Sequence, residues 1–234
     1  MSEFNTKLDH LNWKDISLQL DVEGYAVLPG LLGAEVAGNL AKQATALDIG
    51  RVTLESSDLG RGELLYFGTD LPVPLDTWRP VLYRRLVVIA NRWNETLGLD
   101  YRYPAELDDF LRHNPKAGQT RGQSHLNRLG VDNHVSLHQR NDGEHCFPLQ
   151  IVALLSEPGS DFEGGEFVMT EQRPRMQSRP MVVPLKFGDV AIITTAERPF
   201  KGTKGYYRVN LKHAISRVRM GERIGLELSF HDAC

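Results

Sequence analysis

The sequence feature that most constrains the fold is a series of short, strand-like segments that fills the chain from Ser124 onward. Apolar residues there alternate with polar ones or form short apolar runs, and turn sequences such as Asn141-Asp142-Gly143 separate the segments. We expect strands at residues 126–129, 135–140, 147–156, 165–170, 181–184, 190–195, 206–214 and 224–230. Seven or eight short strands with regular turns predict a β-sandwich or a β-barrel.

The N-terminal part of the chain has helical periodicity instead. We expect helices at residues 13–24, 34–47 and 81–97, a shorter one at 105–113, and a strand at 25–28. The stretch 50–80 is rich in Gly, Pro and Asp and predicts irregular surface structure, with 60–67 as its strand candidate. Because no linker divides the chain, we expect one domain over residues 1–234, with helical support at about 13–113 and a β core at about 124–232.

The composition excludes several classes of protein. A formal net charge of −3 lacks the dominant basic field of a protein that coats DNA or a membrane surface. Two cysteines, Cys146 and Cys234, do not make a disulfide framework, which indicates a reducing compartment. Neither a signal peptide nor a run of 18 apolar residues is visible. These features together predict a cytoplasmic protein without a membrane span.

Two histidines on well-separated strand candidates are the first indication of a functional site. His138 lies in the segment 135–140, and His213 lies far along the chain in 206–214. A barrel can bring two such imidazoles to one ion, and neutral imidazole suits Fe, Zn, Cu or Ni. Either residue could equally be an ordinary core or surface histidine. Arg223 follows His213 by ten residues, and on its own would be a solvated turn charge.

This arrangement resembles the iron(II)/2-oxoglutarate-dependent oxygenases of the prolyl-hydroxylase-like type, whose pattern is H-x-D, a distant H, and an arginine about ten residues further. The stretches GYAVLPGLL, NRWNETLG and FPLQIVALLSEPGSDFEGGEFVMTEQRPRMQSR resemble a bacterial branch of these oxygenases, so the likeness spans roughly 15–233. The resemblance implies a mainly β chain with N-terminal helices that forms a double-stranded β-helix (a jelly roll, cupin-like). It also implies that His138 and His213 bind Fe(II), and that Arg223 holds the distal carboxylate of the cosubstrate 2-oxoglutarate.

Arg140 departs from the family pattern because it stands two residues after His138, where the aspartate is expected. Alternate strand residues share a face, so this side chain starts out aimed at the metal, which a guanidinium cannot ligate. Arg140 must therefore turn away, pair with an anion, or prevent tight iron binding. Three alternatives follow: Asp142 folds back as a substitute ligand, chloride or water fills the position as in the halogenases of this superfamily, or the site is inactive.

The resemblance implies an enzyme that uses Fe(II), 2-oxoglutarate and O₂ to hydroxylate or halogenate an unactivated C–H bond of a small substrate. Two basic loops favour an anionic, phosphorylated substrate, unless their charges serve solubility alone. The loops contain Arg173, Arg175 and Arg179, and Lys201, Lys204 and Arg208. The competing function is that of a non-catalytic β-helix domain which has lost its metal-binding carboxylate and binds a small molecule or a protein.

Overall fold

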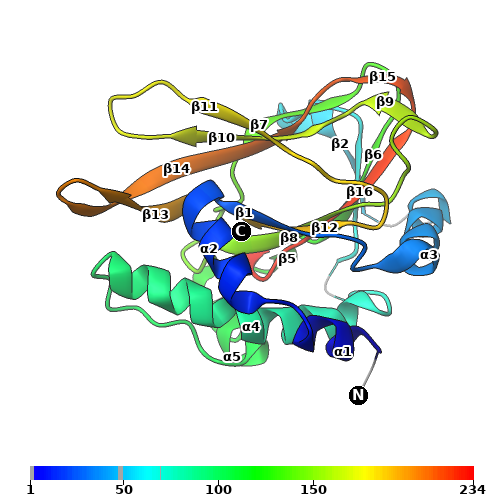
Figure 1. The fold of residues 1–234 in the computed structure, drawn as a ribbon. Coiled ribbons are helices and arrows are strands. Elements are labelled where there is room, and N and C mark those ends of the chain that lie inside the picture. The colour runs from blue at the N-terminus through cyan, green and yellow to red at the C-terminus, as the bar shows by residue number, and fades with distance from the viewer. Residues whose placement is uncertain (1–2, 47–49, 69) are drawn as a thin grey trace.

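The computed structural model describes residues 3–46, 50–68 and 70–234. In this part of the chain, a sheet of seven strands faces a sheet of six, and helices cover the outer face of the larger sheet (Figure 1). All pairings within the two large sheets are antiparallel. The architecture confirms the predicted class, mainly β with N-terminal helices.

The strands of the two sheets come from distant parts of the chain. The larger sheet has the order β1 (Tyr25–Leu28), β12 (Val190–Thr194), β8 (Leu149–Leu154), β16 (Arg223–Leu228), β6 (His125–Leu129), β4 (Glu63–Tyr66) and β2 (Arg51–Thr53). The smaller has the order β11 (Arg179–Val183), β10 (Phe167–Gln172), β14 (Gly205–Ile215), β7 (His134–His138) and β3 (Gly60–Arg61), with β13 (Glu197–Gly202) paired to β14. Two short pairs complete the set: β15 (Val218–Gly221) with β9 (Phe162–Gly164), and β17 (Asp232–Ala233) with β5 (Arg121–Gly122).

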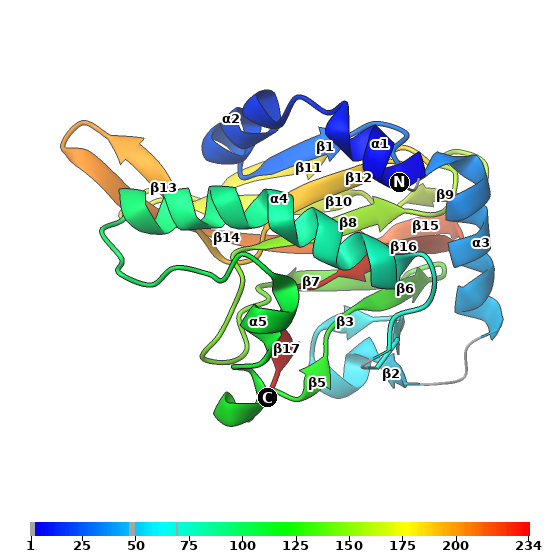
Figure 2. The same cartoon turned by 90° about the horizontal axis from the view of Figure 1, so that it is seen from below.

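Two apolar cores lie on the two faces of the larger sheet. One fills the space between the sheets and includes Leu129, Val152 and Met169. The other packs the opposite face of the larger sheet against the helices (Figure 2). All side chains of β8 and β12 are buried because both faces of these strands are covered.

The four expected helices are present with different extents, and a further helix, α1 (Glu3–Asp9), was not expected. The others are α2 (Trp13–Glu23), α3 (Gly33–Ala46), α4 (Leu75–Thr96), α5 (Leu107–Leu111), and the 3₁₀ turns η1 (Leu54–Ser57) and η2 (Pro115–Ala117). Residue 47, the expected end of the second helix, lies outside the described residues. No helix in the described ranges is long and apolar enough to cross a membrane.

Helix α4 begins six residues before the expected start at residue 81, because Pro80 does not end it. Pro80 is the sixth residue of the helix and removes one N–H donor, but the burial of neighbours such as Trp78 and Leu82 outweighs that loss. The stretch 50–80 is correspondingly more regular than expected, since β2 and β4 extend the larger sheet there. Strand β13 was not among the expected strands. It contains Pro199 and, within the described ranges, pairs with β14 alone, and an edge strand accepts proline.

Candidate metal centre

His138 and His213 lie directly opposite each other on neighbouring strands of the smaller sheet. They are register partners in the antiparallel pair β7 and β14, and their ring centroids are 4.2 Å apart. Both side chains point into the space between the sheets and are buried, at 8% and 1% exposure. The fold therefore brings together the two histidines that the sequence pattern singled out.

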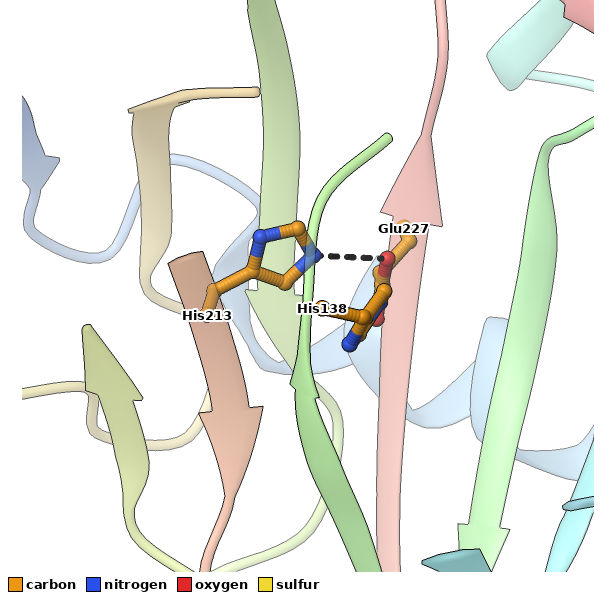
Figure 3. A group of neighbouring side chains, drawn as sticks. All are labelled: His138, His213 and Glu227. Carbon is orange, nitrogen blue, oxygen red and sulfur yellow. Dashed lines mark ion pairs between the residues drawn. The ribbon is translucent and has the colours of Figure 1, made fainter. Parts of the chain in front are cut away.

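Glu227 of β16 reaches the two histidines from the opposite sheet (Figure 3). Its Oε2 lies 3.8 Å from Nε2 of His213, and one potential ligand atom from each of the three residues lies within 4.8 Å of the others. All three residues are buried. The set of two imidazoles and one carboxylate is the facial arrangement that non-haem Fe(II) favours, and it leaves coordination positions open.

The imidazole of His138 presents a ring nitrogen that can bind a metal ion. Its Nδ1 donates to the carbonyl oxygen of Ser136 at 2.9 Å, which leaves Nε2 with its lone pair. That Nε2 is buried and has no hydrogen-bond partner among the described residues. Burial, helped by His213 and Arg140, lowers the pKa of His138 to about 3, so the ring is neutral at physiological pH.

His213 turns its Nε2 toward Glu227, as Figure 3 shows. Its Nδ1 is buried without a hydrogen-bond partner in the described part of the chain, and its ring stacks on Phe167 at 5.8 Å and 9°. The amide of Gln150 lies 3.4 Å from its Nε2. The unpartnered Nε2 of His138 is unfavourable in an empty core, and Nε2 of His213 faces Glu227 at 3.8 Å, so the donor set fits a bound metal ion.

Glu227 is ionised despite its burial. Burial raises the pKa of this carboxyl, but His125, a hydrogen bond from His213, and Arg140 together hold it well below its usual range. His125 is the register partner of Glu227 on β6, with its Nε2 3.6 Å from Oε1. Neither Glu227 nor His125 was among the expected site residues.

Arg140 pairs with an anion, and that anion is Glu227. The guanidinium Nε lies 3.6 Å from Oε2 of Glu227, and Nη2 lies 3.5 Å from Nε2 of His125. Asp142, one of the three alternatives raised by Arg140, is exposed in the loop after β7, and the three-residue group contains Glu227 instead. The carboxylate beside the two histidines thus comes from the opposite sheet.

Arg223 lies on the same strand face as Glu227, at the start of β16, and is 2% exposed. Its Nη1 donates to Oδ1 of Asn127 at 2.8 Å, and its Nε has no hydrogen-bond partner among the described residues. Burial lowers the pKa of Arg223 to about 10, against the opposing effect of Glu227. A cation buried with so few partners can accept an anionic ligand.

Two glycines make room for the Arg223 side chain. A Cβ on Gly225 would lie 2.7 Å from Nη1 of Arg223, and a Cβ on Gly165 would lie 2.9 Å from its Cδ. The guanidinium is therefore held over backbone that only glycine leaves open. Arg223 also lines a pocket of about 330 Å³, together with Phe162 and the Phe167 that stacks on His213.

A second cavity, of about 680 Å³, opens on the side of the site where Arg140 lies. Its lining includes Tyr66, Arg121, Arg140 and Asp142. The ring of Tyr66 is 5.1 Å from that of His125, so this cavity borders the network around Glu227. The residues of the two basic loops do not line either cavity. The loops belong to the β10–β11 and β13–β14 hairpins, which project from one end of the sheets (Figure 1).

The fold is that of the prolyl-hydroxylase-like 2OG-Fe(II) oxygenases, which confirms the predicted double-stranded β-helix. A Pseudomonas putida prolyl-4-hydroxylase aligns with a TM-score of 0.58 and 12% identity over 95% of this chain and 99% of that one. An oxidoreductase of the 2OG-Fe(II) oxygenase family from Burkholderia pseudomallei aligns with a TM-score of 0.55 and 18% identity over 96% and 94%. A Trichoplax adhaerens prolyl hydroxylase, solved with a hypoxia inducible factor peptide, gives 0.56 and 13% over 99% and 94%.

The chain belongs to the Oxygenase-NA family, whose model matches residues 62–233. That family is described as an oxygenase that catalyses oxidative methylation of damaged DNA. Uncharacterized proteins from two Mycobacterium tuberculosis strains, CDC 1551 / Oshkosh and H37Rv, are each 40% identical over 166 residues, which is 69% of this chain and 71% of theirs. The protein is thus an oxygenase, and the matched range contains His138, His213, Arg223 and Glu227.

Proposed function

We propose that this oxygenase uses Fe(II) and 2-oxoglutarate to hydroxylate an unactivated C–H bond, with iron held by His138, His213 and Glu227. The observation that carries the proposal is the buried group of these three side chains, in which Nε2 of His138 has no hydrogen-bond partner among the described residues and Nε2 of His213 faces Glu227. When bound, the iron and its cosubstrate supply the O₂-dependent oxidation. The three protein ligands leave room on the ion for the cosubstrate and O₂.

Arg223 is the residue that holds the distal carboxylate of 2-oxoglutarate. Its guanidinium is buried, is fixed by Asn127, and has an Nε without a partner in the described part of the chain. A planar carboxylate matches the fork of an arginine, and bidentate hydrogen bonds orient it. The pocket beside Arg223 and Phe167 has space for a small dicarboxylate next to the histidines.

The position of Glu227 favours hydroxylation over halogenation. A halogenase needs the carboxylate position vacant for chloride, whereas here a buried, ionised carboxylate lies with the two histidines. The same feature argues against a non-catalytic binding domain, because two imidazoles and a carboxylate are buried together with potential ligand atoms within 4.8 Å of one another. Chloride is therefore not part of the proposed reaction.

The substrate is proposed to be a nucleotide unit of damaged nucleic acid, bound in the cavity beside Arg140. The family description names damaged DNA, and the cavity offers an aromatic ring, Tyr66, and two cations, Arg121 and Arg140. Aromatic stacking and contacts to phosphate are the usual means of holding an unpaired base. A nucleotide also fits the expectation of an anionic, phosphorylated substrate.

Anaerobic addition of Fe(II) and 2-oxoglutarate to the purified chain tests the proposal. We expect a visible charge-transfer band, which the variants Glu227→Ala and His213→Ala should lose. Glu197→Gln is the matched control, because this carboxylate pairs with Arg208 on the surface and lies outside the site. A wild-type chain without the band, or a band that survives Glu227→Ala, would refute the proposed centre.

A further inference from the structure

Arg140 contacts the carboxylate of the metal centre and also lines the larger cavity. Its Nε lies 3.6 Å from Oε2 of Glu227, and its side chain, 11% exposed, forms part of the wall of the 680 Å³ cavity. The end of β7 therefore places a guanidinium between the carboxylate of the metal centre and the space proposed for the substrate. Arg121 and Asp142 supply the other charges on that wall.

The position of Arg140 sets up a competition for one oxygen atom. Oε2 of Glu227 is the atom that faces both Nε of Arg140 and Nε2 of His213, which lies 3.8 Å away. A divalent cation bound between this oxygen and the histidines would be repelled by the guanidinium at short range and in a buried site. Metal binding is therefore weakened for as long as Arg140 remains paired with Glu227.

Arg140 is not tightly held in that position. Its Nε has no hydrogen-bond partner in the described residues, and its contacts with Glu227 and His125 are 3.6 and 3.5 Å long. If the guanidinium moved into the cavity, Oε1 of Glu227 would still face His125 at 3.6 Å. The carboxylate would thus keep one partner while Oε2 became available.

We propose that Arg140 is a positioning residue that couples the two sites: a phosphate group in the cavity draws its guanidinium away from Glu227 and frees Oε2 to bind the metal. This inference rests on the proposed function and adds an order of events to it, because the metal centre becomes complete only when the substrate phosphate is in place. By linkage, a bound metal tightens phosphate binding by the same factor.

Mn²⁺ binding to the full chain, followed by the EPR signal of free Mn²⁺, tests the coupling without turnover. The probes are a deoxynucleoside monophosphate, its nucleoside, and inorganic phosphate. We expect the monophosphate to tighten Mn²⁺ binding about tenfold, which is typical of coupled sites, and the nucleoside to have no effect. An effect of inorganic phosphate as well would show that the anion alone suffices; an equal effect of the nucleoside would overturn the proposal.

Arg140→Gln should bind Mn²⁺ without a probe as tightly as the wild type does with the monophosphate, and should gain nothing further from it. Arg84→Gln is the control, since Arg84 pairs with Glu106 on the surface and lines neither cavity. It should keep the coupling at saturating monophosphate. Because all variants see the same solution, complexes of Mn²⁺ with the probe affect them equally.

Two failures are distinguishable. A wild-type chain that binds no Mn²⁺ would overturn the proposed metal centre, and the coupling with it. Mn²⁺ binding that is equally tight with and without the monophosphate would overturn the coupling alone. This second comparison uses only the wild-type chain, so it does not depend on whether Arg140→Gln folds normally.

Discussion

Arg140 and Glu227 form an ion pair across the two sheets, with 3.6 Å between Nε of Arg140 and Oε2 of Glu227. A cation stands where the related pattern places an aspartate, and a carboxylate reaches the same space from β16. The carboxylate that the pattern places two residues after His138 thus comes from the opposite sheet in this chain. The pair is nearly buried, with 11% and 5% of the two side chains exposed.

Removal of one member of this pair should destabilise the metal-free protein. Glu227→Gln leaves the Arg140 cation buried without its anion, which typically costs about 3 kcal/mol. The double variant Arg140→Gln/Glu227→Gln should recover most of the loss because it leaves no unpaired charge. Urea unfolding of the three chains measures the difference. A single variant as stable as the wild type would show that the pair contributes nothing to folding.

Arg223→Lys should weaken 2-oxoglutarate binding by at least about tenfold. The substitution keeps the charge but removes the fork that can hold a carboxylate with two hydrogen bonds. Titration of 2-oxoglutarate into the Mn²⁺-loaded chain measures the affinity, and Mn²⁺ binding itself should change little. Arg128→Lys is the control, because Arg128 lies on β6 near the same strand end and pairs with the surface residue Glu222. Equal losses in both variants would argue against the assigned role.

Gly225→Ala should have the same effect as Arg223→Lys although it removes no charge. The added Cβ would lie 2.7 Å from Nη1 of Arg223 and 2.8 Å from Oδ1 of Asn127, so the guanidinium must move. Gly38→Ala is a matched control, since Gly38 lies in helix α3 and an added Cβ would meet no atom within 4 Å. There the change should stabilise the chain by up to about 1 kcal/mol. Unchanged 2-oxoglutarate affinity in Gly225→Ala would contradict the described position of Arg223.

The main strands and both histidines could be predicted from the sequence, because strand periodicity and the spacing of His213 and Arg223 are local signals. The partner of Arg140 could not be predicted in this way. Glu227 comes from the other sheet, and its contact with Arg140 depends on how the two sheets face each other. A signal was nevertheless present. Residues 225 and 227 share one face of the expected strand 224–230, and residue 223, directly before it, continues that face. A charged Glu227 in an apolar strand next to Arg223 was therefore a signal for a site residue.

Asp142 was a candidate for a substitute ligand because turn residues can fold back. The sequence alone does not decide whether this turn does so.

The strands within residues 50–80 were harder to predict. Strands β2 and β4 join the larger sheet through pairing with β6, which is a long-range contact, and their own sequences are dominated by turn-forming neighbours. The same applies to α4, in which packing of buried residues such as Trp78 outweighs the local effect of Pro80.

His231 should make the protein less stable in mild acid. Its ring is fully buried, and Nδ1 accepts a hydrogen bond from the N–H of Phe147 at 3.2 Å. Burial, with help from Arg79 and Arg140, lowers the pKa of His231 from 6.5 to about 4. Between these values the unfolded chain binds a proton that the folded chain does not, so stability falls as the pH falls from 6.5 towards 4.

The contribution of His231 to this loss is up to about 3 kcal/mol, from a shift of roughly 2.5 pKa units. His231→Asn tests it, because the amide oxygen of asparagine can accept the same hydrogen bond and does not titrate. Urea unfolding at a series of pH values should show a shallower decline below pH 6.5 for the variant than for the wild type. The two curves should run parallel above pH 7.5, where the histidine is neutral in both states. Equal slopes between pH 6.5 and 4 would mean that this ring gains its proton in the folded protein as easily as in the unfolded one.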